Sequence, residues 1–201
     1  MKAGDGAAAG EVTLNEVTRR FGDQIVLDGL SLTLAPGRVT ALMGPNASGK
    51  TTVARLVLGL DRPDDGRVVG RHGLRCAAVF QEDRLCEHLS AAENVALVLE
   101  HPNRAAVAKE LGAVGLDAEA IARPVRELSG GQRRRVAIAR ALSGDADLIV
   151  LDEPFTGIDV ETKPELIAYV RGRLGGRTML LITHDRSEAT QLKAKVVRLG
   201  G

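Results

Sequence analysis

Aromatic side chains, cysteines and long apolar runs are all scarce in this chain of 201 residues. It has no Trp, one Tyr, three Phe and two cysteines, Cys76 and Cys86, whose spacing matches no disulfide framework, so reduced thiols are expected. Its four histidines form no metal-ligand pattern. No stretch approaches the roughly 18 consecutive apolar residues of a membrane span, and residues 1–10 lack the apolar core of a secretory signal. If the protein works at a membrane, we expect another chain to supply the membrane-spanning part.

Charge of neither sign dominates, since 27 basic residues face 26 acidic ones for a formal net charge of +1. No strong field therefore marks the chain as a binder of nucleic acid or of a charged lipid surface. The one dense basic run, residues 133–135, is predicted to be a solvated or partner-facing surface rather than a DNA contact. The length suits one domain with its own core, and the Gly/Ala-rich residues 1–10 are expected to be a disordered tail.

A glycine-rich segment with the pattern G-x-x-x-x-G-K-[ST] lies between a strand-like run and a helix-like run. It consists of Gly44, Pro45, Asn46, Ala47, Ser48, Gly49, Lys50 and Thr51. Residues 39–43 are typical of a strand, and the run that begins at Thr52 is typical of a helix, which is the context that a phosphate-binding loop needs. The glycines let the backbone wrap a β-phosphate, Lys50 reaches the β- and γ-phosphates, and the Thr51 hydroxyl can bind Mg²⁺. Thr52, which follows directly, is also expected to bind ATP. That context argues against the alternative, a Gly/Ser-rich turn without a ligand.

Two acidic residues follow four apolar ones at residues 148–151. Such a run predicts a buried parallel strand, and Asp152 and Glu153 then lie at its C-terminal end, where open α/β sheets bind ligands. Asp152 is suited to the Mg²⁺ shell, and Glu153 is suited to polarising an attacking water as a general base. The alternative is a strand end with two solvated acids, and a phosphate-binding loop, whose ligand carries a metal, argues against it.

A third motif consists of Leu128, Ser129, Gly130, Gly131 and Gln132, and strong helix formers follow it. Each glycine costs a helix roughly 0.5–1 kcal/mol relative to alanine, so two adjacent glycines are better explained by close approach of the backbone to a ligand. A helix N-terminus with free N–H groups, a serine hydroxyl and a positive dipole end suits an anion. Taken alone, the motif is explained equally well by an ordinary Ser N-cap after a loop.

In this order, the motifs resemble those of the ATP-binding subunit of an ABC transporter, over about residues 12–199. The matches are residues 44–51 for the Walker A motif, Gln81 for the Q-loop, residues 128–132 for the signature motif, Asp152 and Glu153 for the Walker B motif, Asp159 for the D-loop and His184 for the switch histidine. The segment around residues 80–85 and the compact build are similar to the nitrate/sulfonate/taurine importer branch.

The resemblance implies further roles. Gln81 would touch Mg²⁺ or the attacking water, and His184 would contact the γ-phosphate. Phe21 falls where the family stacks an aromatic ring on adenine, and its neighbours, polar residues before it and Gly22 after it, fit a core position poorly. Phe80 and Phe155 are predicted to pack in the core at strand ends. Ala47 replaces a glycine of many family members, and we expect a small residue to suffice there.

The assembly is also implied by the resemblance. Ser129 and Gly131 of one subunit would complete the ATP site built on Lys50 of a second copy, with Asp159 crossing between the two chains. ATP would then join a homodimer of two-fold symmetry, and its γ-phosphate would favour the closed state until hydrolysis removes it.

The family implies an α/β fold: a P-loop NTPase core with a mainly parallel sheet, an N-terminal antiparallel β subdomain and an inserted helical subdomain. We expect a single domain over residues 11–201. The nucleotide core would span about residues 11–81 and 129–201, and the helical subdomain about residues 82–128.

Local patterns agree with this division. Alternating residues at 12–17 and 31–34 predict antiparallel strands. Strand signals vanish after residue 82, and Ser90 with Glu93 matches a capping box. Residues 61–66 are predicted to form a turn, and residues 162–165 are predicted to start a helix with a second Thr-x-x-Glu pattern.

The main hypothesis is therefore an ATPase with ATP and Mg²⁺ as its ligands. It would dimerise on ATP and drive a separate transmembrane permease from the cytoplasmic face of the cell membrane, with a solute-binding protein if it imports, and without a nucleic-acid partner. One alternative is a soluble ABC ATPase acting on ribosomes or DNA, which would need a second cassette, a long charged linker or coiled-coil arms. Another is a non-hydrolysing nucleotide-binding scaffold, and Glu153 and His184 argue against it.

Overall fold

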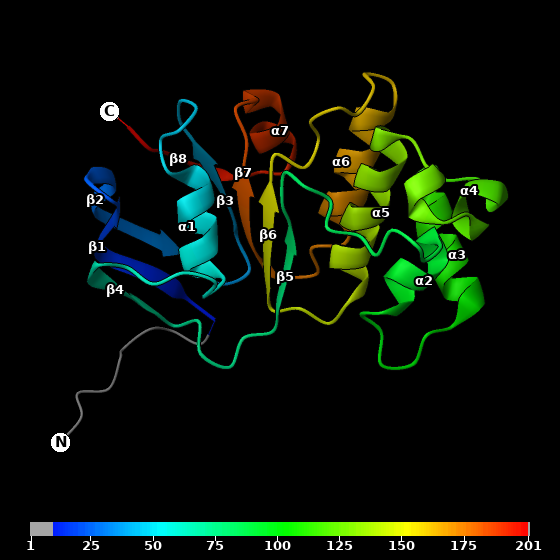
Figure 1. Ribbon diagram of the computed structural model, residues 1–201, viewed down its shortest axis with the longest axis horizontal. Coiled ribbons are helices and arrows are strands. Elements are labelled where there is room, and N and C mark those ends of the chain that lie inside the picture. Colours follow the sequence, from blue (N-terminus) through cyan, green and yellow to red (C-terminus); the bar gives the residue numbers. More distant parts are fainter. Residues whose placement is uncertain (1–9, 201) are drawn as a thin grey trace.

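Two sheets and a set of helices form the part of the chain that the computed structural model describes, residues 10–200. The tail expected at residues 1–10 lies, except for Gly10, outside the described residues. Figure 1 shows the antiparallel sheet at one end of the molecule, the parallel sheet in the middle, and the helices formed by residues 91–122 at the other end. The α/β fold with a parallel core sheet and an antiparallel β region is confirmed.

The strands divide between a three-stranded sheet in the order β2-β1-β4 and a five-stranded sheet in the order β5-β6-β7-β3-β8. Their bounds are β1 (Val12–Phe21), β2 (Gln24–Leu34), β3 (Val39–Met43), β4 (Asp65–Val69), β5 (Cys76–Val79), β6 (Leu148–Asp152), β7 (Thr178–Ile182) and β8 (Lys195–Arg198). The helices are α1 (Lys50–Val57), α2 (Ala91–Ala96), α3 (Arg104–Ala113), α4 (Ala118–Ala122), the 3-10 helix η1 (Val125–Glu127), α5 (Gly130–Ser143), α6 (Thr162–Gly172) and α7 (Arg186–Gln191). No helix among residues 10–200 combines the length and the apolar character needed to cross a membrane.

The antiparallel sheet corrects one expectation. The turn predicted at residues 61–66 ends earlier, because Asp65 and Gly66 already belong to β4, which pairs with β1. The physical reason is an irregularity in β1, where Glu16 has a φ of 47°. A Cβ atom on Gly66 would lie 2.3 Å from the Glu16 carbonyl oxygen. The glycine therefore marks a close approach of two strand backbones rather than a turn.

The parallel sheet is covered on both faces, which explains its continuous apolar sequences. Every residue of β3, β6 and β7 is buried. On one face Ile149 and Leu181 belong to the core that includes the buried side chains of α5 and α6. On the other face Val150 and Leu180 belong to the core that includes α1 and the antiparallel sheet. Successive side chains of a strand point to opposite faces of the sheet. Each strand therefore contributes alternate residues to the two cores.

Between β5 and β6 the described chain forms helices and one isolated β-bridge, which joins Ser90 to Pro124. The predicted capping box is confirmed at α2: Ser90 Oγ accepts from the Glu93 backbone N–H at 3.1 Å, and Glu93 Oε2 accepts from the Ser90 N–H at 2.8 Å. Because this pattern is local in sequence, it is predictable without knowledge of the tertiary contacts.

The second Thr-x-x-Glu pattern has a different outcome. Helix α6 begins at Thr162 as predicted, but its cap comes from Asp159, whose Oδ1 accepts from the Thr162 N–H at 2.7 Å. The pKa of Asp159 is lowered by these hydrogen bonds with Thr162. The residue expected to cross to a second chain thus also shapes the start of its own helix.

The prediction of a solvated or partner-facing surface at residues 133–135 is wrong for Arg134. Its exposure is 8%, whereas Arg133 and Arg135 are half-buried. Arg133 donates to the Leu128 carbonyl at 2.7 Å, and Arg135 donates to the Gly115 carbonyl at 2.6 Å. Consecutive residues of an α-helix point about 100° apart, so three adjacent arginines cannot share one solvent-facing side.

Candidate functional site

The strand order brings the predicted site residues to one edge of the parallel sheet. Strands β5, β6, β7 and β3 are consecutive neighbours and run in the same direction. Gln81 follows β5, Asp152 and Glu153 end and follow β6, His184 follows β7, and the glycine-rich loop follows β3. The carboxyl ends of parallel strands meet at the same edge, where open α/β sheets bind their ligands.

The glycine-rich loop leaves no room for side chains at its two glycines. A Cβ atom on Gly44 would lie 2.6 Å from the Leu199 carbonyl oxygen, and one on Gly49 would lie 2.7 Å from Leu27 Cδ2. Gly49 also has a φ of 89°, and Ala47 has a φ of 62°. Gly49 lacks a side-chain cap at the start of α1, so the first N–H groups of that helix are free to bind an anion.

The ammonium group of Lys50 lies against this loop. Its Nζ donates to the Gly44 carbonyl at 2.9 Å and to the Pro45 carbonyl at 2.6 Å. A positive charge and the N-terminus of α1 are therefore directed to the same region. This arrangement suits a phosphate group better than any neutral ligand.

A cavity of about 480 Å³ connects the loop with residues from three other segments. It is lined by Phe21, Val26, Asn46, Ala47, Gly49, Lys50, Thr51, Thr52, Gln81 and Glu153. Its volume is within the range of small-molecule sites. Phe21 is 49% exposed here, with the Arg19 guanidinium 4.7 Å from the ring centroid. The expectation that Phe21 lies outside the core is confirmed, whereas Phe155 is buried and Phe80 is only half-buried.

Thr51 and Asp152 form an oxygen-rich pair beside this cavity. The Thr51 hydroxyl donates to Asp152 Oδ2 at 2.8 Å, while Oδ1 of Asp152 is buried without a hydrogen-bond partner among the described residues. Burial raises the pKa of Asp152 and the charge of Glu153 adds to this, whereas the hydrogen bond from Thr51 lowers it. A buried carboxylate oxygen without a partner is costly, and oxygen ligands are those that Mg²⁺ prefers. These residues therefore fit a magnesium ion.

Glu153 and His184 contact each other directly. His184 Nδ1 lies 3.0 Å from Glu153 Oε2 and 3.2 Å from Oε1. An ionised carboxylate only accepts hydrogen bonds, so the proton of this contact belongs to the imidazole. Glu153 has a φ of 49°, and its N–H donates to the Ile182 carbonyl at 2.9 Å. A left-handed conformation at a non-glycine residue is strained and marks functional sites.

A polar network that includes both chain neighbours of His184, and is buried at Thr183 and Glu188, was not predicted from the sequence. Lys163 Nζ lies 2.9 Å from Asp185 Oδ2 and 2.6 Å from Glu188 Oε1, and Glu188 also accepts a hydrogen bond from Thr183. Glu188 is 4% exposed. The network fixes the residues on both sides of His184 to α6, the helix that follows the D-loop. Lys163 and Glu188 are far apart in the sequence, so no local pattern predicted that they would pair.

The signature motif lies outside the cavity of its own chain: none of residues 128–132 is among the described residues that line it. Ser129 and Gln132 form a capping box, with Ser129 Oγ accepting from the Gln132 N–H at 3.2 Å. A Cβ atom on Gly131 would lie 3.6 Å from the Gly157 carbonyl oxygen, so the motif adjoins the D-loop segment. The Ser N-cap is therefore present, followed by the exposed Gly130 and the half-buried Gly131.

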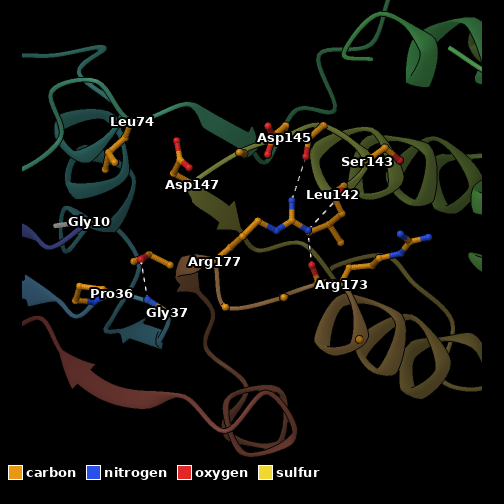
Figure 2. Close-up of a pocket in the computed structure, with 16 residues that line it drawn as sticks. Gly10, Pro36, Gly37, Leu74, Leu142, Ser143, Asp145, Asp147, Arg173 and Arg177 are labelled. Atoms are coloured by element: carbon orange, nitrogen blue, oxygen red, sulfur yellow. Dashed lines mark hydrogen bonds between the residues drawn. The ribbon is translucent and has the colours of Figure 1, made fainter. Parts of the chain in front are cut away.

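A larger cavity, of about 850 Å³, lies at the opposite edge of the sheet (Figure 2). It is lined by residues that precede β3, β6 and β7, far from the glycine-rich loop. Arg177 extends along it and donates to the Leu142 and Gly144 carbonyls at 3.2 Å each, and to the Leu174 carbonyl at 3.3 Å. These carbonyls end α5 and follow α6, so this guanidinium caps helix C-termini. These N–H groups of Arg177 therefore stabilise the ends of the helices and are not free for a ligand. We place the candidate site in the smaller cavity.

Comparison with known proteins agrees with this geometry. The sequence model of the family described as ABC transporter matches residues 27–156, more than half of the chain. The chain belongs to the ABC transporter family. Its solved structural neighbours include the ATP-binding cassette MJ0796 in a dimeric post-hydrolysis state bound to ADP and Pi, with a TM-score of 0.81, 26% identity and 94% of each chain covered.

Curated relatives of this ABC protein include importer subunits. It is 37% identical to the sulfate/thiosulfate import ATP-binding protein CysA of Mycobacterium tuberculosis, over 94% of this chain. It is 41% identical to the aliphatic sulfonates import ATP-binding protein SsuB of Granulibacter bethesdensis, over 94% of this chain and 79% of that protein. The chain spans 58% of the length of CysA. The resemblance to the sulfonate branch of importers is thus confirmed.

Proposed function

We propose that this ABC protein binds and hydrolyses ATP with Mg²⁺. The observation that carries the proposal is the convergence of Lys50, Asp152, Glu153, His184 and Gln81 at the carboxyl edge of adjacent parallel strands. The glycine-rich loop and Lys50 hold the phosphates, and Phe21 stacks on the adenine at the far end of the cavity. If the glycine-rich loop were only a turn, nothing would explain why these charged and polar side chains gather beside it.

The proposed hydrolysis needs a water held between two residues and the γ-phosphate. Glu153 accepts a proton from this water while the water oxygen bonds to the γ-phosphorus and the bond to the β–γ bridging oxygen breaks, so that ADP leaves. His184 keeps the carboxylate oriented through the 3.0 Å contact. Gln81 lines the cavity and completes the water site. Thr51 and Asp152 would hold Mg²⁺, which would supply positive charge to the phosphate oxygens.

Two substitutions test the chemistry and separate an ATPase from a nucleotide-binding scaffold. We expect Lys50→Ala to weaken ATP binding, and Glu153→Gln to keep binding while turnover falls by about 10²–10⁴, the usual contribution of a positioned base. Binding is measured by titration with ATP and turnover by release of phosphate. Wild-type turnover in Glu153→Gln would overturn the assignment, and no turnover in the unmodified protein would favour the scaffold.

We infer that ATP joins two copies of the chain. The position of Ser129 and Gly131 outside their own cavity and beside the D-loop supports this, as does the likeness to a dimeric cassette. Glu153→Gln should dimerise with ATP, whereas addition of Ser129→Arg should abolish the dimer and leave ATP binding to the monomer nearly intact. Sedimentation with and without ATP measures both. A Ser129→Arg protein that still dimerises, or that loses monomer binding, contradicts the arrangement.

We further propose that the dimer drives a transmembrane permease from the cytoplasmic face of the membrane. The import named in the relatives CysA and SsuB supports uptake, a solute-binding protein and a sulfur-containing oxyanion as cargo. The experiment is co-expression with the transmembrane permease of an ABC importer, followed by membrane sedimentation and ATP-dependent uptake of labelled sulfate and sulfonate. A chain that stays in the soluble fraction and associates with ribosomes or DNA would favour the non-transport alternative.

A further inference from the structure

A buried arginine connects the Q-loop to the signature helix. Arg134 of α5 is 8% exposed, and its Nη1 and Nη2 donate to the carbonyls of Phe80 and Gln81 at 2.5 and 2.6 Å. Nη1 also lies 3.2 Å from Asp83 Oδ1. A buried guanidinium is tolerated only when its donors are satisfied, so Arg134 requires these contacts. They join two segments that are 53 residues apart in the sequence.

Other contacts strengthen the attachment of this segment to helices. Arg140, also of α5, donates to the Asp83 carbonyl at 3.3 Å. Asn94 of α2 accepts from the Cys86 N–H at 2.8 Å and donates to the Cys86 carbonyl at 3.1 Å. Residues 80–86 are therefore held from two helices that lie between β5 and β6. Arg134 alone reaches Gln81 itself among the side-chain contacts of the described residues.

The two ends of this connection belong to different nucleotide sites under the proposed function. The Gln81 side chain lines the cavity of its own chain. Arg134 lies within the first two turns of α5, the helix that Ser129 caps and that contains Gly131, and neither Ser129 nor Gly131 is among the described residues that line that cavity. A displacement of the Gln81 backbone is thus transmitted to the N-terminus of α5 through two short hydrogen bonds.

We propose that Arg134 is a positioning residue that makes Gln81 and the signature motif of the same chain move as one unit. When the Gln81 side chain engages the γ-phosphate region of its own site, Arg134 carries α5 into the position in which Ser129 meets the nucleotide of a second copy. The inference rests on the proposed function. A guanidinium suits the task because its planar fork binds two consecutive carbonyls, which a lysine cannot do with fixed geometry.

The test uses Arg134→Gln and Arg134→Lys in the Glu153→Gln background, with ATP-dependent dimerisation measured by sedimentation and monomer ATP affinity measured by titration. We expect Arg134→Gln to raise the ATP concentration needed for dimerisation by about tenfold, which corresponds to the loss of hydrogen bonds from a charged donor. Monomer affinity should change by less than about twofold, and Arg134→Lys should be intermediate because it keeps a charged donor group but lacks the planar fork.

Arg135→Gln is the matched control. Arg135 is the next residue of α5 and also donates to carbonyls, those of Val114 and Gly115 at 3.1 and 2.6 Å and that of Gly131 in its own helix at 3.4 Å, but not to residues 80–86. If Arg134 acted only through stability, the two glutamine variants would have similar effects on dimerisation. We expect Arg135→Gln to keep the ATP dependence of the dimer.

A double-mutant cycle separates positioning from general damage. Gln81→Ala removes the side chain and keeps the carbonyl that Arg134 binds, so Arg134→Gln should have little further effect on dimerisation in that background. Additive effects would overturn the inference, as would dimerisation by Arg134→Gln at the unaltered ATP concentration. Failure of Glu153→Gln itself to dimerise would instead refute the proposed dimer.

Discussion

The hydroxyl of Thr51, in the first turn of α1, donates a 2.8 Å hydrogen bond to Oδ2 of Asp152 at the end of β6. The second oxygen of the same carboxylate is buried without a hydrogen-bond partner among residues 10–200. The pair thus combines a satisfied oxygen with an unsatisfied one. This is an unfavourable arrangement for the free protein and a suitable one for a divalent cation.

We expect Asp152→Asn to preserve the stability of the free protein and to remove the extra stability that Mg²⁺ gives in the presence of ATP. Burial raises the pKa of Asp152 because the charged form is disfavoured there. A neutral amide should therefore leave the melting temperature of the free protein unchanged or higher. Mg²⁺ with ATP should stabilise the unmodified chain, by about 2.7 kcal/mol at a hundredfold excess over Kd, and the Mg²⁺-dependent part should vanish in Asp152→Asn. Thermal denaturation with ATP and either Mg²⁺ or a chelator decides it, and an equal Mg²⁺ response in both proteins contradicts the site.

Phe21 should contribute to ATP affinity through stacking. Its ring is half exposed and has the Arg19 guanidinium 4.7 Å from its centroid, with Arg19 itself held by Asp64 at 2.9 Å. Base–aromatic stacking is worth about 1–3 kcal/mol, so Phe21→Ala should weaken ATP binding roughly 5- to 150-fold and Phe21→Trp should retain it. Isothermal titration measures the affinity.

The control for Phe21 is Ile25→Ala on the same hairpin. Ile25 is 51% exposed and is absent from the residues that line the cavity. The two substitutions therefore remove a similarly exposed apolar side chain from one hairpin. If Ile25→Ala weakened ATP binding as much as Phe21→Ala, loss of hairpin structure rather than loss of stacking would be the cause.

Ala47→Gly should not destabilise the protein, although alanine-to-glycine changes usually do. Ala47 has a φ of 62°, a left-handed conformation that costs a residue with a Cβ roughly 1–2 kcal/mol. Glycine relieves this and loses about 0.4–1 kcal/mol through the greater entropy of the unfolded chain. The net change is between neutral and a gain of about 1.6 kcal/mol. Urea denaturation measures it, with Ala108→Gly in the middle of α3 as a control that should lose about 1 kcal/mol.

Acid should weaken the link between Lys163 and Asp185. The hydrogen bond from Lys163 holds the pKa of Asp185 below its ordinary value, against the effect of burial. Because the pKa is lower in the folded state, the contribution of this carboxylate to stability is fully present above its unfolded pKa. It is lost as the pH falls from about 4 through the lower folded value.

Comparison of Lys163→Gln with Lys163→Arg separates the acid sensitivity due to the Lys163 contact from that due to carboxylates elsewhere in the protein. The free energy of unfolding, measured between about pH 2 and pH 5, should fall less steeply with acid in Lys163→Gln than in the unmodified chain. Lys163→Arg keeps a positive charge beside Asp185 and Glu188 and should keep the steeper slope. Identical slopes in all three proteins would show that the contact does not contribute.

Short-range patterns in the sequence determined the fold class and most members of the site. The glycine-rich loop, the apolar strand before Asp152 and the capping box of Ser90 with Glu93 each depend on residues close together in the chain. The first predicts a left-handed backbone, the second a buried parallel strand and the third satisfied N–H groups at a helix start. Each of these features can therefore be predicted without knowledge of tertiary contacts. The order of the motifs along the chain then indicated the family.

Only the tertiary structure decided what depends on a distant partner. The burial of Arg134 is set by the Phe80 and Gln81 carbonyls, which face one side of α5 and not the other. Gly66 belongs to a strand because the irregular backbone at Glu16 lies against it. The pairing of Lys163 with Glu188 likewise exists because α6 packs beside α7. In each case the residue type allowed several environments, and long-range packing selected one because only there were its polar groups or its backbone satisfied.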